Sequence, residues 1–249
     1  NQVLSSNVTI LNAKPTISIL VLNTTNISSN NTDVNLTAYT TTSDIDNDSV
    51  KVIYNWLRNW TSIAVLNMPF EGINGTATDN AWDYSGYGNN GSERQNATWN
   101  STGGYDGKGA YQFNGNNSFI SVKHNQTIVY TGQNFSWSFW MYPTDANGGY
   151  IISKPWNDVG QYNYQIIYTS TLKINFILRG NVSDEFTTSN AFARNQWHYV
   201  VATADSNRNM SVYVDGILQA SKIHQIINWT PTGGNPGRKV SGRMRQTSP

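Results

Sequence analysis

The chain has no cysteine, little charge and no long hydrophobic run. Without disulfides its stability has to come from large hydrophobic cores, which its 249 residues are enough to build. Charged residues make up 12% of the sequence and the net charge is +1, which argues against nucleic acid or a charged membrane surface as the partner. No run of about 18 apolar residues occurs, so the sequence predicts no transmembrane helix.

What the chain does have is a composition typical of β-structure. It holds 9 Trp and 14 Tyr together with many Thr and Val, residue types that favour strands over helices. Segments with period-two alternation recur along the chain, separated by Gly, Asn and Asp, and no segment has helical periodicity. The sequence therefore predicts an all-β fold, as one large domain or two smaller ones.

N-glycosylation sequons are unusually dense. Seventeen Asn-x-Ser/Thr triplets without proline at x occur, more than twice the number that a random order of the same residues would give. The acceptors are Asn7, Asn23, Asn26, Asn30, Asn35, Asn47, Asn59, Asn74, Asn90, Asn96, Asn100, Asn116, Asn125, Asn134, Asn181, Asn209 and Asn228. This density predicts an N-glycosylated extracellular protein, and the lack of disulfides favours the surface of an archaeon or a bacterium.

The position of a sequon relative to the predicted strands sets its expected occupancy. Asn134 and Asn209 lie at or inside predicted strands, where a glycan fits only if the side chain points outward. We expect them to be occupied less often than the sequons of predicted loops, which are Asn23, Asn26, Asn30, Asn74, Asn96, Asn100, Asn125 and Asn181.

The first 62 residues divide into an arm and a short β-segment. Residues 1–14 form a β-prone arm with no neighbouring strand to pair with. The segment 15–62 has predicted strands at 16–22, 34–39 and 50–57. Asp44, Asp46 and Asp48 lie between the last two strands, and their alternating carboxylates can converge on Ca²⁺ or form a turn.

This order of strand, Asp-rich loop and strand ending in Tyr54-x-Trp56 resembles the first half of the immunoglobulin-like, PKD-like modules of prokaryotic surface proteins. The resemblance implies that Trp56 plugs a β-sandwich. It is partial, because such a sandwich needs about seven strands and this stretch supplies three or four. The missing strands come from elsewhere, or the segment packs as an appendage on the next domain.

From Ile63 onward the pattern predicts a two-sheet sandwich. Strands are expected at 63–72, 118–122 and 134–143, and the last of these places Phe135, Trp137 and Phe139 on one face. Further strands are expected up to Val214, after which Asp215-Gly216 predicts a tight hairpin turn.

Several motifs in this region resemble the laminin G-like, concanavalin A-like jelly-roll family. They are Phe70-Glu71-Gly72, Asp83-x-Ser85-Gly86-x-Gly88-x-x-Gly91, Ala110-Tyr111-x-Phe113-x-Gly115, Phe135-Ser136-x-Ser138-x-Trp140, Trp197-His198-Tyr199-Val200-Val201 and Val212-Tyr213-Val214-Asp215-Gly216. The resemblance covers about residues 63–225 and implies a jelly roll of two curved antiparallel sheets. We assign residues 63–232 to this domain.

The carboxyl end departs from that family. The family's chain closes with a strand carrying Gly-x-Ile-Asp-Glu-Val, and residues 233–249, a basic irregular tail, hold nothing like it. A sandwich without its closing strand exposes unpaired backbone groups, to which the arm of another subunit can add as a donor strand. The sequence therefore predicts a head-to-tail homo-polymer. The alternative is a truncated carboxyl end and a frayed arm.

Residues suited to catalysis are sparse, so we predict no enzyme. Glu71, Glu93 and Glu185 are the only glutamates, and they are too far apart in sequence to suggest the paired carboxylates of a glycoside hydrolase. A cysteine nucleophile and a Gly-x-Ser-x-Gly elbow are both absent from the sequence. The three histidines show no metal-ligand spacing, and His198 is expected to be packed.

Ligand binding is the remaining chemistry. Aromatic rings near predicted rims can stack on sugars, and the candidates are Trp82, Tyr84, Tyr87 and Trp156. Trp137, Trp140 and Trp197 are expected in the core or packed on a sheet. The jelly-roll family's Ca²⁺ site could use the loop that holds Asp79 and Asp83.

The function that the sequence predicts is structural. We expect an extracellular, heavily N-glycosylated subunit of a prokaryotic surface filament or coat, with copies of itself as partners. The alternative is a carbohydrate-binding or adhesion module of a cell-surface protein, with glycans as partners and Ca²⁺ as a supporting ion.

Overall fold

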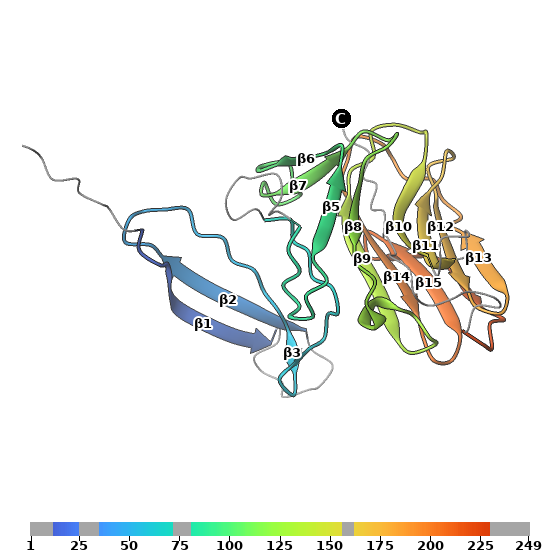
Figure 1. Ribbon diagram of the computed structural model, residues 1–249, viewed down its shortest axis with the longest axis horizontal. Coiled ribbons are helices and arrows are strands. Elements are labelled where there is room, and N and C mark those ends of the chain that lie inside the picture. Colours follow the sequence, from blue (N-terminus) through green and yellow to red (C-terminus); the bar gives the residue numbers. More distant parts are fainter. Residues whose placement is uncertain (1–11, 25–34, 72–80, 156–161, 230–249) are drawn as a thin grey trace, which may run out of the picture. The chain divides into compact units, whose positions relative to one another are not determined.

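The computed structural model describes residues 12–24, 35–71, 81–155 and 162–229 (Figure 1). In these ranges the chain is β-structure with one short 3-10 helix, which confirms the predicted all-β class. It divides into two compact units, Asn1–Tyr54 and Asn55–Pro249. The structure thus separates the units before residue 62, where the sequence placed the boundary.

The first unit contains one antiparallel hairpin. Its strands are β1 (Thr16–Thr24) and β2 (Leu36–Ser43), with Leu20 opposite Thr40. Apolar side chains on both faces of β1 are exposed, including Ile19 and Leu20. A two-stranded hairpin alone is only marginally stable in water because it buries little apolar surface. The described residues of this unit thus form a hairpin, and the resemblance to an immunoglobulin-like segment stays a prediction.

The prediction of a strand at 50–57 was wrong. Only Leu57–Arg58 (β3) is extended, and it pairs with Thr61–Ser62 (β4) across a tight turn. Trp56 is exposed and does not plug a core. A β-strand forms only where a neighbouring strand pairs with its backbone, and no described strand pairs with residues 50–56.

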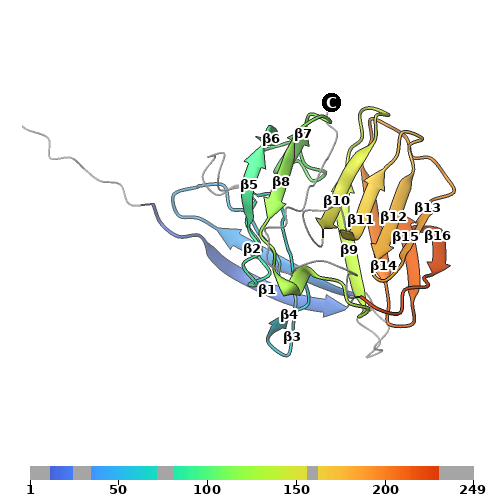
Figure 2. The same cartoon turned by 45° about the vertical axis from the view of Figure 1, so that its right-hand side comes forward.

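The second unit contains a sandwich of two four-stranded antiparallel sheets. Sheet I has the order β10-β11-β12-β13, and sheet II has the order β16-β15-β14-β9. Sheet I consists of β10 (Gly149–Pro155), β11 (Tyr162–Tyr168), β12 (Ile174–Arg179) and β13 (Ser183–Thr187). Sheet II consists of β9 (Phe135–Met141), β14 (His198–Ala204), β15 (Asn209–Val214) and β16 (Ile217–Ile223). Figures 1 and 2 show the sheets as two layers.

The main hydrophobic core lies between these sheets. Phe176 and Leu178 project into it from sheet I, and Val200 and Val212 project from sheet II. Burial alternates strictly along β14, because successive side chains of a strand point to opposite faces. Trp137 is 6% exposed and belongs to this core, as the sequence predicted. The arrangement agrees with the predicted antiparallel jelly-roll sandwich.

A second, smaller core lies beside two short sheets. One sheet pairs β5 (Gly91–Gln95) with β8 (Phe119–Val122), and the other pairs β6 (Ala97–Asn100) with β7 (Ala110–Phe113). Their core includes Tyr111, Phe113 and Ile120. Residues 63–71, predicted as a strand, form none. Instead the buried Glu71 side chain accepts a hydrogen bond from the Gly109 backbone N–H.

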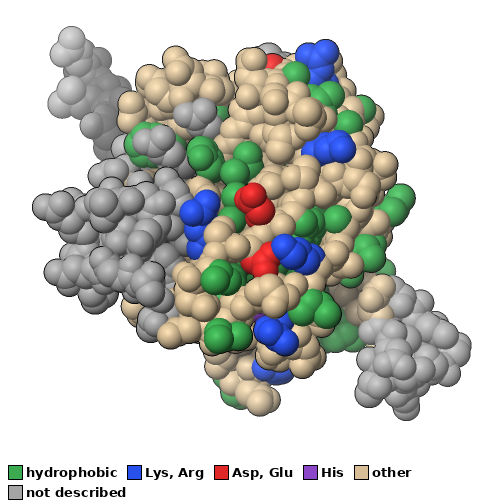
Figure 3. Space-filling view, turned by 90° about the vertical axis from the view of Figure 1, so that its right-hand side faces the viewer, with side chains coloured by type: hydrophobic (Ala, Val, Ile, Leu, Met, Phe, Trp, Pro, Cys, Tyr) green, Lys and Arg blue, Asp and Glu red, His purple; other side chains and the backbone are tan. Residues whose placement is uncertain are grey.

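Two polar features lie at the edges of the sandwich, a tight turn and an ion pair. Asp215 and Gly216 both have positive φ and form the predicted tight turn between β15 and β16. At the edge where β13 meets β16, buried Asp184 pairs with Lys222 and accepts the Gln225 backbone N–H. Burial raises the pKa of Asp184, but these hydrogen bonds and the Lys222 charge outweigh it and lower that pKa overall. Figure 3 shows one face of the protein, on which basic side chains (blue) and acidic side chains (red) lie close together.

Candidate functional site

Strand β9 carries two tryptophans, one buried and one exposed. Trp137 points into the core, whereas Trp140 lies on the outer face of sheet II and is 40% exposed. The two are three residues apart, an odd number, so the period-two geometry of a strand places them on opposite faces. Of the two predicted alternatives, Trp137 lies in the core and Trp140 is packed on the outer face of a sheet.

Trp140 is part of an exposed aromatic cluster, which we define as Tyr105, Trp140, Tyr142, Trp197 and Tyr199. Tyr105 stacks on Trp140 with ring centroids 3.6 Å apart and an interplanar angle of 9°. The ring centroids of Trp140 and Tyr199 are 5.0 Å apart. The ring centroid of Trp197 lies 6.3 Å from that of Tyr105 and 5.5 Å from that of Tyr142. The cluster thus joins the loop before β7, the end of β9 and the start of β14.

Tyr105 reaches the sheet from the tip of a tight turn. The Gly107 N–H donates to the Gly104 carbonyl at 3.0 Å, and the Gly104 N–H donates to the Lys108 carbonyl at 2.7 Å. Gly107 has φ +75°, which glycine adopts without strain. Tyr105 is 58% exposed although it stacks on Trp140, so the outer face of its ring is open to solvent.

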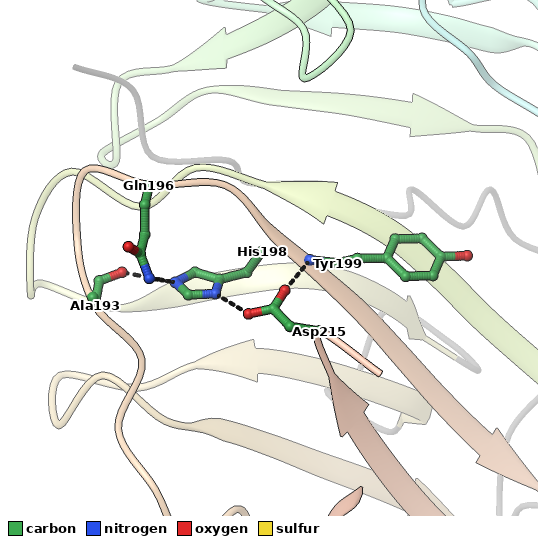
Figure 4. Close-up of polar contacts among 5 residues, drawn as sticks. All are labelled: Ala193, Gln196, His198, Tyr199 and Asp215. Carbon is green, nitrogen blue, oxygen red and sulfur yellow. Dashed lines mark hydrogen bonds and ion pairs between the residues drawn. The ribbon is translucent and has the colours of Figure 1, made fainter. Parts of the chain in front are cut away.

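A buried polar clamp lies at the base of the cluster (Figure 4). His198 Nδ1 is 2.8 Å from Asp215 Oδ2, and His198 Nε2 is 2.9 Å from the Ala193 carbonyl oxygen. Asp215 Oδ1 accepts the Tyr199 N–H at 2.9 Å, and in Figure 4 the Tyr199 side chain points away from the His198 ring. The clamp therefore ties the β15–β16 turn to the part of β14 that carries Tyr199.

The clamp holds His198 in place through hydrogen bonds to both of its ring nitrogens. Both nitrogens of His198 lie within hydrogen-bond distance of oxygen atoms, one of Asp215 and one of the Ala193 backbone. His198 is only 3% exposed, and the Gln196 amide lies 3.4 Å from Nε2. Both ring nitrogens are thus engaged within the protein.

The predicted ligand site in the loop 82–91 is organised around Asp83. Its carboxylate accepts the backbone N–H groups of Asn67, Ser85 and Asn89 and the Ser85 hydroxyl. The loop exposes Trp82, at 44%, and Tyr87. The structure places both of them on the surface, as a ligand contact requires.

The other predicted ligand residues do not extend that surface. Tyr84 is half-buried and its hydroxyl is buried. Burial, followed by the charge of Glu71, raises the pKa of Tyr84. Trp156 lies outside the described residues.

The predicted metal ligands form turns. Asp44 Oδ1 accepts the backbone N–H groups of Asp46 and Asp48, and Asp46 Oδ2 accepts that of Ala13. Asp79 lies outside the described residues. No cluster of three potential metal ligands occurs within the described ranges. A Ca²⁺ site therefore stays a prediction.

The described sequon asparagines all reach solvent. None is buried, and most are exposed, including Asn134 and Asn209. By contrast Asn89 and Asn163, which are not in sequons, are buried. The sequons at Asn7, Asn26, Asn30 and Asn74 lie outside the described residues. Glycosylation stays a prediction, and the exposure of these side chains is compatible with it.

Two further titratable groups are buried without an acidic partner among the described residues. Lys154 donates to His124 Nδ1 at 2.8 Å, and burial lowers the pKa of Lys154 to about 8. His224 is buried against Trp229, and neither of its ring nitrogens has a hydrogen-bond partner in the described ranges. Burial lowers the pKa of His224, which nearby Asp184 raises in part. Both groups lie apart from the aromatic cluster in the contacts described.

Sequence reasoning missed the aromatic cluster, although one signal pointed to part of it. The alternation that places Phe135, Trp137 and Phe139 on one face necessarily places Trp140 on the other. No comparable signal existed for Tyr105, since its contact with Trp140 joins positions far apart in the chain.

The fold and site together describe a jelly-roll sandwich with an exposed aromatic surface on one sheet. A family model described as the concanavalin A-like lectin/glucanases superfamily, of the laminin G type, matches residues 113–245, more than half of the chain. The chain belongs to this superfamily. The match begins later than the resemblance seen in the sequence and extends into residues 233–249, which the sequence analysis set apart as a tail. The comparison with curated proteins gives no match.

Solved structures are similar to this chain at low identity. The binding domain of paraclostridial mosquitocidal protein 1 is 17% identical with a TM-score of 0.48, covering 68% of this chain and 47% of that chain. The botulinum neurotoxin serotype G binding domain is 20% identical with a TM-score of 0.47, covering 67% and 46%. Domain 4 of AbnA, an extracellular arabinanase of Geobacillus stearothermophilus, solved with arabinotriose, is 16% identical with a TM-score of 0.43, covering 64% and 70%. The chain thus spans less than half of each toxin structure.

The described ranges contain no helix of the length and hydropathy needed to span a bilayer.

Proposed function

We propose that this protein is an extracellular carbohydrate-binding module whose ligand contacts the aromatic cluster. One observation carries the proposal: Tyr105 and Trp140 form a stacked, solvent-exposed aromatic surface on a domain of a lectin and glucanase superfamily. A sugar ring has an apolar face of C–H groups, which an open aromatic ring contacts favourably because both surfaces are then removed from water.

The surroundings of the cluster favour sugars over other ligands. Its charged neighbours in the Tyr105 loop, Asp106 and Lys108, pair with each other at 3.3 Å, so they leave little net field. Nucleic acids and anionic membrane surfaces are bound by clusters of Lys and Arg. The cluster supplies no such charges, and we place neither class of ligand there.

The extracellular location rests on the sequons. None of the described acceptor asparagines has a buried side chain, so a glycan on any of them would project from the surface and not into a core. A coat of sugars would supply the solubility that a 12% charged chain does not get from ionised groups. We assign the protein no catalytic role, because the clamp at the base of the cluster has no free base.

The test compares two tryptophans of similar exposure. The full chain is run through gels containing cellulose derivatives, mannan, xylan or arabinan, and retardation measures its affinity. We expect at least one neutral polysaccharide to retard the wild type, and Trp140→Ala to weaken that affinity about tenfold or more. Trp82→Ala, the matched control, should leave it unchanged. No retardation by any polysaccharide, or loss of binding in Trp82→Ala alone, would contradict the proposal.

A second candidate function, self-assembly, is favoured by the β1–β2 hairpin. Its apolar side chains are exposed on both faces, including Ile17, Leu20 and Leu22. A strand from another copy would cover an edge of the hairpin and bury some of them. A head-to-tail surface filament remains a proposal on this ground. Negative-stain images of protein lacking residues 1–13 test it: assemblies that persist rule out donation by the arm.

A further inference from the structure

Along the strands, the outer face of sheet II changes from aromatic side chains at one end to hydroxyl-bearing side chains at the other. At one end Trp140 lies opposite Tyr199. At the other end four hydroxyl side chains cross all four strands in register, a set that we call the hydroxyl row. It consists of Ser136, Thr203, Ser211 and Ser221. Between these ends Ser138, Val201 and Tyr213 lie opposite one another.

The hydroxyls of this face have no hydrogen-bond partners among the residues that the structure describes. No hydrogen bond from the described residues reaches the hydroxyls of the hydroxyl row, of Ser138 or of Tyr213. Ser136, Ser138 and Ser221 are exposed, and the others are half-buried. In solution, hydroxyls that reach the surface and lack a protein partner bind water, and a ligand with its own hydroxyls can replace that water without leaving a polar group unsatisfied.

The outward side chains of this face also carry no charge. From the cluster to the hydroxyl row, the residues that alternate outward on β9, β14, β15 and β16 are Ser, Thr, Tyr, Trp, Val and Leu. Lys222, the charged residue of β16, pairs with Asp184 at the sheet edge. An acidic ligand would lose its hydration here without gaining a cation. An uncharged ligand loses nothing of that kind.

The distance between the two ends exceeds one sugar ring. Trp140 and Ser136 are four residues apart on β9, which is about 13 Å at a strand rise of about 3.3 Å per residue. We propose that this face binds an uncharged glycan chain lengthwise. One sugar stacks on the aromatic cluster, and the following units exchange hydrogen bonds with Ser138, Tyr213 and the hydroxyl row. This inference rests on the proposed carbohydrate-binding function and adds the class and orientation of the ligand.

Chain length provides the test. Calorimetric titrations of the full chain use cello-, manno-, xylo- and arabino-oligosaccharides of two to six units, with oligogalacturonate as the acidic counterpart. For the series that binds, we expect affinity to rise about tenfold between two and four units and then to level off, with oligogalacturonate bound at least about tenfold more weakly.

Variants separate the two ends of the face. Ser136→Ala combined with Thr203→Val should lower the affinity for the longer chains about three- to tenfold and leave the disaccharide unchanged. Ser183→Ala, an exposed serine on sheet I, is the matched control and should change neither. Trp140→Ala should weaken every length.

Three results would overturn the inference. Affinity independent of length, with Trp140 still required, would refute the lengthwise orientation and leave the binding function standing. Equal affinity for oligogalacturonate would refute the uncharged class in the same way. No binding of any saccharide would remove the proposed function itself.

Discussion

Each face of sheet II carries a tryptophan with aromatic neighbours, but the inner one is buried in the core and the outer one is exposed. On the inner face, Trp137 packs against Tyr164 and Phe176 of sheet I and is nearly inaccessible. On the outer face, Trp140 contacts Tyr105 and Tyr199 and remains accessible. The residue type does not decide which role a tryptophan has. Its register on the strand does, together with whether a second sheet covers that face.

The largest expected effect is at the inner face. Trp137→Ala should lower the free energy of unfolding by about 3–5 kcal/mol, because it removes a large buried side chain and leaves a cavity between the sheets. Chemical denaturation followed by circular dichroism measures the change. A loss below about 1 kcal/mol would mean that this face is not the core, and the contrast between the faces would fail.

The clamp links the two faces, and its loss should have an intermediate effect. Asp215→Ala should lower the free energy of unfolding by about 1.5–3 kcal/mol, because it leaves Nδ1 of the buried His198 ring without a partner. Asp215→Asn is the control, since it keeps an acceptor and suits a residue with φ of 53°. If both variants lose the same amount, the charge of Asp215 and not its hydrogen bonds holds the clamp.

The outer face should contribute least to stability. Trp140→Ala should lower the free energy of unfolding by only about 0.5–1.5 kcal/mol, the value of an aromatic pair whose area is still partly exposed. The same denaturation experiment as for Trp137→Ala gives the comparison directly. A loss as large as that of the inner tryptophan would make Trp140 a core residue, and its effect on binding would then reflect unfolding.

The buried His224 should make the stability of the protein depend on pH. Burial lowers the pKa of His224 below its ordinary 6.5, so the unfolded chain binds a proton that the folded chain does not. Stability is therefore fully present above about pH 6.5 and is lost as the pH falls through that value. His224→Leu should flatten this part of the profile in thermal melts. Asp184, whose pKa is lowered from 3.8, should cause a separate loss at more acid pH.

The sequence predicted more of the fold than of the site. The strands around Phe135, Val200 and Val212 and the Asp215-Gly216 turn follow from local alternation and turn chemistry, which neighbouring residues determine. The strand expected at 50–57 does not form over that length, because no described strand pairs with residues 50–56. The aromatic cluster depends on contacts between Tyr105 and Trp140, and no local pattern reports such a contact.

Nuclear magnetic resonance of the bound protein tests the central claim most directly. The full chain, labelled on its tryptophan indoles and backbone amides, is titrated with the neutral oligosaccharide that binds it. The account predicts the largest shifts at Trp140, Tyr199, Tyr105 and Ser138, with none at the loop that carries Trp82. Shifts confined to that loop would contradict the account and return the site to the residues first indicated by the sequence.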